Sequence, residues 1–218
     1  MKNKIVLFIL FVLPIVAYLF FSSGVHSFAK LPVLNEQTLT LPDWGVSDQD
    51  SLLSFENKIT ILGFSGKDTR EHKGNAFNLN QKIYNKVREF KDFQLIMIAP
   101  KGTEDEIQDL KEELGRISDL SRWHYLFAND TSINEFYKAL GLNETLDENV
   151  GSPFVYIIDK GGLLRGRKGK NKKGEEEYRE GYNTISAADL HNEMGDDVKV
   201  ILAEYRLALK KNTADRKK

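Results

Sequence analysis

The stretch that decides the fold is GSPFVYIIDKGG, residues 151–162. Its centre, Phe154–Ile158, is a short apolar run that predicts a buried strand. Asp159–Gly162 predicts a turn, and Leu163–Leu164 begins a strand that returns beside the first. Because Pro153 precedes the strand directly, and an X–Pro bond is placed in cis at small energetic cost, we expect a cis peptide between Ser152 and Pro153.

Three further strands are predicted upstream, at Ile59–Phe64, Phe93–Ala99 and Trp123–Ala128, because each is a mostly apolar run between polar residues. Amphipathic helices alternate with them. Thr103 with Glu106, and Ser132 with Glu135, have the spacing of capping boxes that open two of these helices. The predicted apolar stripes are Ala76, Leu79, Ile83, Val87 and Phe90; Ile107, Leu110, Leu114 and Ile117; Ile133, Phe136, Tyr137 and Leu140; and Val198, Ile201, Leu202, Tyr205 and Leu209.

This order of elements predicts an α/β domain with a mixed sheet, a parallel sheet that gains an antiparallel edge, flanked by helices on both faces. The alternating Leu39–Leu41 could form an edge hairpin. The predicted organisation is an N-terminal signal anchor or transmembrane helix (1–24), a lead-in linker with an edge hairpin (25–50), the main domain (51–210) and a charged tail (211–218).

The N-terminus has the pattern of an export signal. Lys2 and Lys4 precede an apolar run, Ile5–Phe21, that is long enough to cross a bilayer. Ser27–Ala29 loosely resembles a cleavage site, so the segment is either retained as an anchor or removed. The early lysines predict a cytoplasmic N-terminus and an exported body, which in a bacterium means a single-pass inner-membrane protein with a periplasmic domain.

The sequence resembles thioredoxin-like proteins, and among them the membrane-anchored Sco/SenC type, with the TlpA/ResA type as the near alternative. The likeness rests on Ile59–Phe64 with the polar loop after it, on residues 151–162, and on Trp123–Phe127 between the two capped helices. It implies a thioredoxin-like fold over about Leu39 to Leu209. In such folds the active-site loop lies beside the proline segment, so Lys67, Arg70 and Ser152 should share one surface.

The residues that carry the chemistry of these families are missing. The sequence contains no cysteine, and a thiolate is both the nucleophile of disulfide exchange and the soft ligand for copper. Aligned without gaps from Phe64, the two copper-binding cysteines of Sco proteins fall on Lys67 and Glu71, and their histidine falls near Gly151. We therefore expect neither disulfide exchange nor Cu(I) delivery by that route, and no metal or cofactor.

The polar loop after the first predicted strand is the first candidate site. Its residues Lys67, Asp68, Arg70, Glu71 and His72 form either a recognition loop or a hard-cation site, or a solvated loop in which Asp68 or Thr69 caps the following helix. The neighbouring cations disfavour a metal ion. With Ser152 and Pro153, these residues are the predicted docking face.

A basic block is the second candidate, formed by Arg165, Arg167, Lys168, Lys170, Lys172 and Lys173. Glu175–Glu177 and Glu180 follow at once. The block is either a hairpin whose two signs of charge cancel, or a docking surface for an acidic partner or lipid headgroups.

The four histidines, His26, His72, His124 and His191, form no metal-binding spacing, and His124 is expected to be a hydrogen-bonded residue of a half-buried strand. The net charge of −1 gives no attraction for nucleic acid. No motif joins a nucleophile to a base. The sequence therefore predicts a non-enzymatic binding or assembly partner of an envelope or membrane complex. A Sco-like metallochaperone for respiratory oxidase assembly, using ligands other than cysteine, is the alternative.

Overall fold

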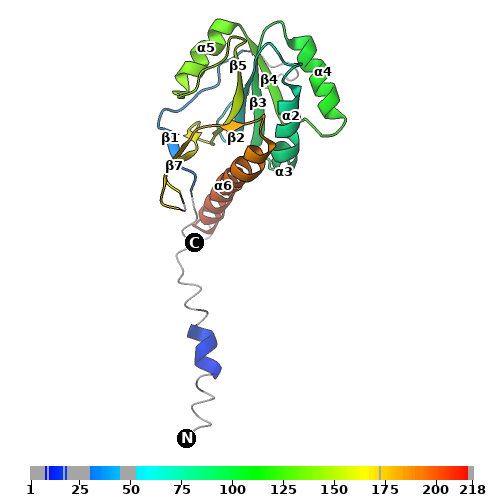
Figure 1. The fold of residues 1–218 in the computed structure, drawn as a ribbon. Coiled ribbons are helices and arrows are strands. Elements are labelled where there is room, and N and C mark those ends of the chain that lie inside the picture. The colour runs from blue at the N-terminus through cyan, green and yellow to red at the C-terminus, as the bar shows by residue number, and fades with distance from the viewer. Residues whose placement is uncertain are drawn as a thin grey trace.

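The computed structural model describes residues 8, 10–16, 18, 30–44, 53–171 and 173–215, and Figure 1 shows their arrangement. The predicted membrane segment, residues 1–24, lies mostly outside this part; Phe8, residues 10–16 and Tyr18 are helical. Among the described helices, none combines the length and the apolar character needed to cross a membrane. His26, the cleavage-like site, Lys172 and the last three residues of the tail also lie outside the described residues.

The elements follow one another in this order: β1 (Val33–Asn35), β2 (Ile59–Ser65), α2 (Lys73–Leu79), η1 (Asn80–Tyr84), α3 (Asn85–Val87), β3 (Phe93–Pro100), α4 (Glu104–Gly115), β4 (Trp123–Ala128), α5 (Asp130–Ala139), β5 (Gly151–Ile158), β6 (Leu164–Arg165), β7 (Arg167–Lys170), β8 (Glu176–Arg179), β9 (Tyr182–Asn183), η2 (Asp189–Met194) and α6 (Gly195–Asp215). The segment η1 is a π-helical turn that joins α2 to α3.

The main sheet has the strand order β1-β6-β5-β2-β3-β4, and β9 pairs with β5. Strands β2, β3 and β4 are parallel, whereas β5 runs antiparallel to β2. Helices α2, α4 and α6 cover one face of the sheet and α5 covers the other (Figure 1). The molecule is thus a mixed α/β sheet of the thioredoxin-like type with flanking helices, as the sequence predicts.

Side chains of each strand alternate between two apolar clusters, as the period of a strand requires. In β2, Ile59 and Ile61 point toward the cluster below α2, α4 and α6, and Leu62 and Phe64 point toward the cluster below α5. Strands buried on both faces give continuous apolar runs, which is why β2, β3 and β4 were recognisable in the sequence.

The peptide between Ser152 and Pro153 is trans, because the described residues contain no cis peptide bond. The prediction of a cis bond is therefore wrong. Strand β5 begins at Gly151, three residues earlier than predicted, and Ser152 is paired with Phe64 of β2. The Pro153 carbonyl accepts hydrogen bonds from the Thr184 amide (2.8 Å) and hydroxyl (2.7 Å). The proline thus lies within an extended strand rather than before it.

The lead-in adds an edge strand at a different place from the one predicted. Strand β1, Val33–Asn35, pairs with β6, whereas Leu39–Leu41 is not a strand. The Leu39 amide instead donates to the Gly162 carbonyl (2.8 Å), which holds the lead-in against the Asp159–Gly162 turn. That turn is confirmed, since the Asp159 carboxylate accepts the Gly161 and Leu163 amides.

Two stripe residues lie outside the core. Phe90 is 42% exposed and Ile117 is also exposed, because α3 ends at Val87 and α4 ends at Gly115, before either residue. The other described members of those two stripes face the sheet.

Neither predicted capping box forms. The Thr103 hydroxyl donates to the Pro100 carbonyl (2.7 Å) and does not cap α4. Helix α5 starts at Asp130, two residues before Ser132, and its N-cap is Asn129, whose side-chain oxygen accepts the Ser132 amide (2.8 Å).

We expect Asn129→Ala to lower the free energy of unfolding by about 1 kcal/mol, because the exposed amide at the start of α5 loses its acceptor. Urea unfolding measures this difference. The matched control is Ser132→Ala, whose hydroxyl has no capping role, and it should stay within about 0.5 kcal/mol of the original chain. A larger loss for the control would contradict this assignment of the cap.

Candidate functional site

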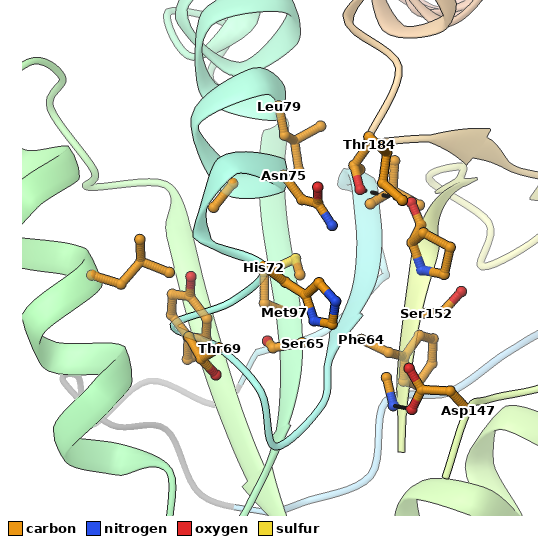
Figure 2. A pocket seen from close by; sticks show the side chains of 17 residues that line it. Phe64, Ser65, Thr69, His72, Asn75, Leu79, Met97, Asp147, Ser152 and Thr184 are labelled. Atoms are coloured by element: carbon orange, nitrogen blue, oxygen red, sulfur yellow. Dashed lines mark hydrogen bonds between the residues drawn. The ribbon is translucent and has the colours of Figure 1, made fainter. Parts of the chain in front are cut away.

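A pocket of about 250 Å³ opens at the carboxyl end of β2, between the first turns of α2 and the start of β5. We call it the β5 pocket, and Figure 2 shows it from close by. Its apolar side is formed by Phe64, Leu79, Met97 and Val155 among others. Its polar lining comes from Thr69, His72, Asn75, Ser152 and Thr184. A concave site with an apolar base and a few polar groups is typical of a binding site, and this volume suits one side chain.

A glycine in β2 lies under the Met97 side chain at the base of the pocket. A Cβ atom at Gly63 would lie 2.6 Å from the Met97 Sδ, so a larger residue there would displace the end of the methionine side chain. Figure 2 shows the Met97 sulfur facing the space between His72 and the strands. Methionine adapts its shape readily, so this base of the pocket can adjust to different apolar groups.

Thr69 is the one pocket residue with an unsatisfied buried group. The residue is only 4% exposed, and its hydroxyl oxygen has no hydrogen-bond partner within the described part of the chain. A buried hydroxyl without a partner costs about 1–3 kcal/mol. A bound group that donates to it or accepts from it would recover that energy.

The acidic residues at the pocket mouth already accept hydrogen bonds from the loop before β5. The Asp147 carboxylate accepts the amides of Asn149 (2.9 Å) and Gly151 (2.8 Å). Asn149 in turn donates its side-chain amide to Asp68. These bonds fix the loop before β5, and they leave Asp147 in a structural role.

Only part of the predicted docking face lines the pocket, namely His72, Ser152 and Pro153. Lys67 pairs with Asp130 (2.5 Å), and Arg70 lies 3.8 Å from both Glu106 and Asp109. The lysine and arginine therefore neutralise the starts of α5 and α4. Glu71 is exposed in the same loop and does not line the pocket.

Sequence reasoning missed Thr69 because the ungapped alignment placed the active positions at Lys67 and Glu71, four residues apart. The structure puts Thr69 and His72 at the pocket, three residues apart. That is the separation in the Cys-x-x-Cys motif of thiol oxidoreductases. The expected helix cap is also absent: His72 is the N-cap of α2, and no side chain caps this helix.

A side chain would be crowded at Gly151, the remaining ligand position of the Sco pattern. A Cβ atom at Gly151 would lie 3.1 Å from the Gly66 Cα and 3.2 Å from an Asp147 carboxylate oxygen. Among the described residues, no three His, Asp or Glu side chains are grouped so that they could hold a metal ion. The residues present therefore do not fit a copper centre of the Sco type.

His124 lies in the predicted strand β4, but that strand is buried along nearly all of its length rather than half-buried, and the His124 side chain is its partly exposed residue. Burial lowers the pKa of its imidazole, and the positive charges of Lys111, Lys58 and Arg122 lower this pKa further. A neutral imidazole inside a sheet has a structural role, and His124 does not line the β5 pocket.

The basic block forms the predicted hairpin, but its two arginines point into the structure. Arg165 is buried and pairs with Asp159 (2.6 Å) and Glu204 (2.7 Å). Arg167 pairs with Asp197 (2.7 Å), Glu193 (2.5 Å) and Glu177 (3.1 Å). Burial disfavours the charged form of both arginines, but the carboxylate partners outweigh it and raise their pKa. The exposed described cations of the block are Lys168, Lys170 and Lys173.

No family model and no curated protein matches this chain. Solved structures do resemble it. The thioredoxin domain of a thiol-disulfide oxidoreductase from Bacteroides vulgatus has 17% identity and a TM-score of 0.46, over 78% of this chain and 98% of that one. BsSco, a member of the Sco family of cytochrome c oxidase assembly proteins, has 13% identity and a TM-score of 0.48, over 80% and 98%. A thiol:disulfide interchange protein from Bacteroides sp. has 16% identity and a TM-score of 0.46, over 79% and 92%.

These neighbours belong to the thioredoxin-like groups that the sequence resembles. The fold assignment for this chain rests on its own strand order.

Proposed function

We propose that this chain is a membrane-anchored, exported thioredoxin-like domain without redox activity, which binds another protein of a bacterial envelope. The β5 pocket carries this proposal. It combines an apolar base, a polar rim and a buried hydroxyl that lacks a partner. The chain has no thiol that could attack a disulfide, so binding without covalent chemistry is the activity the site supports best.

The pocket would take an apolar side chain of the partner. Burying such a side chain contributes about 1.5–3 kcal/mol, and a polar neighbour would satisfy the Thr69 hydroxyl. An extended segment is not expected to add a strand at this point, because the Pro153 carbonyl and the Gly151 amide and carbonyl are already hydrogen-bonded. The interaction would therefore depend on the pocket and its rim.

A metallochaperone that uses ligands other than cysteine is the weaker candidate. The positions that match Sco ligands are a lysine paired with Asp130, an exposed glutamate and a glycine, which has no side chain to offer. An ammonium group paired with a carboxylate offers no lone pair to Cu(I), which prefers soft ligands.

We expect Ala76→Phe to abolish recovery of the partner, because Ala76 lies on α2 and lines the β5 pocket. The full-length tagged chain would be purified from native membranes, and proteins that co-purify in proportion to the bait would be quantified by mass spectrometry. The original chain should recover one dominant partner. The variant should recover at least tenfold less of it.

The matched control is Gly74→Phe, which introduces the same side chain two residues earlier on the same helix. Gly74 does not line the pocket, and a Cβ atom there meets no other atom within 4 Å. The control should recover the partner at the level of the original chain. Equal recovery by Ala76→Phe and the original chain would contradict the proposed role of the pocket.

A further inference from the structure

A second cavity, of about 330 Å³, lies between α3 with its preceding turn η1 and the first half of α6. We call it the α6 groove. Its apolar lining includes Ile83, Val87, Val198 and Leu202, and Phe90 stands at its side with 42% of its surface exposed. A large aromatic side chain exposed next to an apolar groove marks an interaction surface.

The polar groups around the α6 groove are all cationic. Lys82, Lys86, Lys199 and Arg206 line it, and no carboxylate does. Lys199 is paired with Asp196 (2.9 Å), and the Lys86 amine lies 3.2 Å from the His191 Nδ1. Within the described part of the chain, no carboxylate lies within ion-pair distance of Lys82 or Arg206. The groove therefore combines apolar surface with unneutralised positive charge, and an amphipathic anion complements both.

The same end of the molecule is tied to the predicted membrane segment. The Arg165 Nε donates to the Leu31 carbonyl (2.7 Å), and its guanidinium also binds Glu204 of α6. Leu31 is buried in the same apolar cluster as Val198 and Ile201 of α6. The predicted segment ends at Gly24, and seven peptide units reach at most about 25 Å. An anchored chain thus keeps this part of α6 close to the bilayer.

The sequence also becomes strongly basic toward the C-terminal end of α6 and beyond it. After Glu204 the sequence contains six basic residues and one acidic residue, Asp215; the basic ones are Arg206, Lys210, Lys211, Arg216, Lys217 and Lys218. Basic segments next to a membrane anchor are attracted to anionic lipids.

The α6 groove and the β5 pocket lie at opposite ends of the sheet. Phe90 comes just before β3, whose first residue, Phe93, is level with Ile59 at the start of β2. The β5 pocket instead uses Phe64 and Ser65 at the end of β2. The two ends of β2 are six residues apart, or about 20 Å, although the linings of the two sites come close together where α2 meets η1.

We propose that the α6 groove binds anionic phospholipids of the bilayer that holds the N-terminal segment, with the acyl region against Phe90 and Leu202 and the headgroups against Lys86 and Arg206. This inference rests on the anchor in the proposed function. The inference goes beyond the proposed function because it gives the exported domain a fixed orientation relative to the membrane. Contact at the α6 groove keeps the β5 pocket on the side facing away from the membrane, where a partner can reach it.

The absence of cysteine from the chain makes a site-specific test possible. The variants Glu89→Cys, exposed beside Phe90, and Asp105→Cys, exposed in the first turn of α4, would each carry a fluorophore on their one thiol. The full-length chain would be placed in nanodiscs of phosphatidylcholine alone or with phosphatidylglycerol, each containing lipid with a spin-labelled headgroup. Quenching of the fluorophore by the spin label measures contact with the bilayer surface.

Phosphatidylglycerol should produce strong quenching at position 89 and little at position 105. Because each basic group near an anionic surface strengthens binding about fivefold, the double variant Lys86→Gln/Arg206→Gln should reduce the docked fraction relative to the free fraction by about 25-fold. High salt should act in the same direction. The matched control, Lys101→Gln/Lys138→Gln, removes two exposed charges that do not line the α6 groove, and it should leave quenching unchanged.

Equal quenching at positions 89 and 105, or quenching that does not depend on phosphatidylglycerol, would overturn the lipid site. The lipid site would also be overturned if the fluorophore at position 89 responded to an added acidic protein and not to phosphatidylglycerol. That result would favour a protein partner at the α6 groove. Washing the membranes with alkaline carbonate separates failure of the membrane anchor from failure of the lipid site. Release of the chain by this wash would contradict the anchor. A chain that stays in the membrane but shows no quenching would contradict only the lipid site.

Discussion

Replacing Arg165 with methionine should lower the free energy of unfolding by about 3–5 kcal/mol, because the substitution leaves the Asp159 carboxylate buried without its counter-ion. Arg165 is 5% exposed and binds three separate parts of the chain: Asp159 in the turn, Glu204 on α6 and the carbonyl of Leu31 in the lead-in. Urea unfolding of the full-length chain in mild detergent measures the difference.

The control for this experiment is Lys168→Met, an exposed residue of the same basic block, which should change stability by less than about 0.5 kcal/mol. The double variant Arg165→Met/Asp159→Asn should recover part of the loss, since it removes the buried charge and keeps an acceptor for the Gly161 and Leu163 amides. Equal effects of Arg165→Met and Lys168→Met would show that the arginine belongs to a solvated surface.

The basic block shows why charge runs are hard to interpret from sequence. The run was visible and the hairpin was predicted, because Lys and Glu segments follow each other at close spacing. The partners of its arginines, however, come from distant positions such as Asp197 and Glu204. Only the fold brings them together, so the separation of structural arginines from exposed lysines was not predictable.

The strands were predictable because burial on both faces leaves an unbroken apolar run, and Trp123–Ala128 was predicted with its observed bounds. Strand β1 has only three residues and pairs with β6, about 130 residues away, so no local pattern revealed it. The cap of α5 was missed for a related reason. Capping depends on the extended backbone of Asn129 (φ −73°, ψ 158°), and the Ser132–Glu135 spacing carries no information about that angle.

The candidate site was predicted in outline and not in detail. The polar loop and the proline segment do meet, and His72, Ser152 and Pro153 line one pocket. Thr184 reaches it because β9 pairs with β5, a contact between segments about 30 residues apart. The position of Thr69 depends on where the loop ends and α2 begins, which an ungapped alignment from Phe64 does not determine.

Raising the pH above about 10 should unfold the chain steeply, because several tyrosines are buried in their neutral form. Burial raises the pKa of Tyr125, Tyr156 and Tyr182 far above the ordinary value, and the Asp197 charge adds to the effect on Tyr182. Burial also raises the pKa of Tyr205 to about 12. In the unfolded chain these phenols titrate near pH 10.

The direction of the effect follows from which state holds the protons. Between pH 10 and 12 the unfolded chain loses its phenolic protons while the folded chain keeps them, so stability is complete below pH 10 and falls above it. Each deeply buried tyrosine contributes a slope of about 1.4 kcal/mol per pH unit. Tyr125, Tyr156 and Tyr182 together give about 4 kcal/mol per pH unit, which is enough to unfold a domain of ordinary stability before about pH 12.

Urea unfolding from pH 8 to 11.5 measures this slope, and the absorbance of tyrosinate near 295 nm should rise together with the loss of helix signal in circular dichroism. Tyr125→Phe should reduce the slope by about one third, because one buried titrating group is removed from a fully enclosed position. Tyr178→Phe is the matched control, since Tyr178 is 52% exposed, and it should reduce the slope much less than Tyr125→Phe does. If tyrosinate formed near pH 10 while the helix signal persisted, these phenols would be accessible in the folded chain, and the close packing of both apolar layers around β4 and β5 would be contradicted.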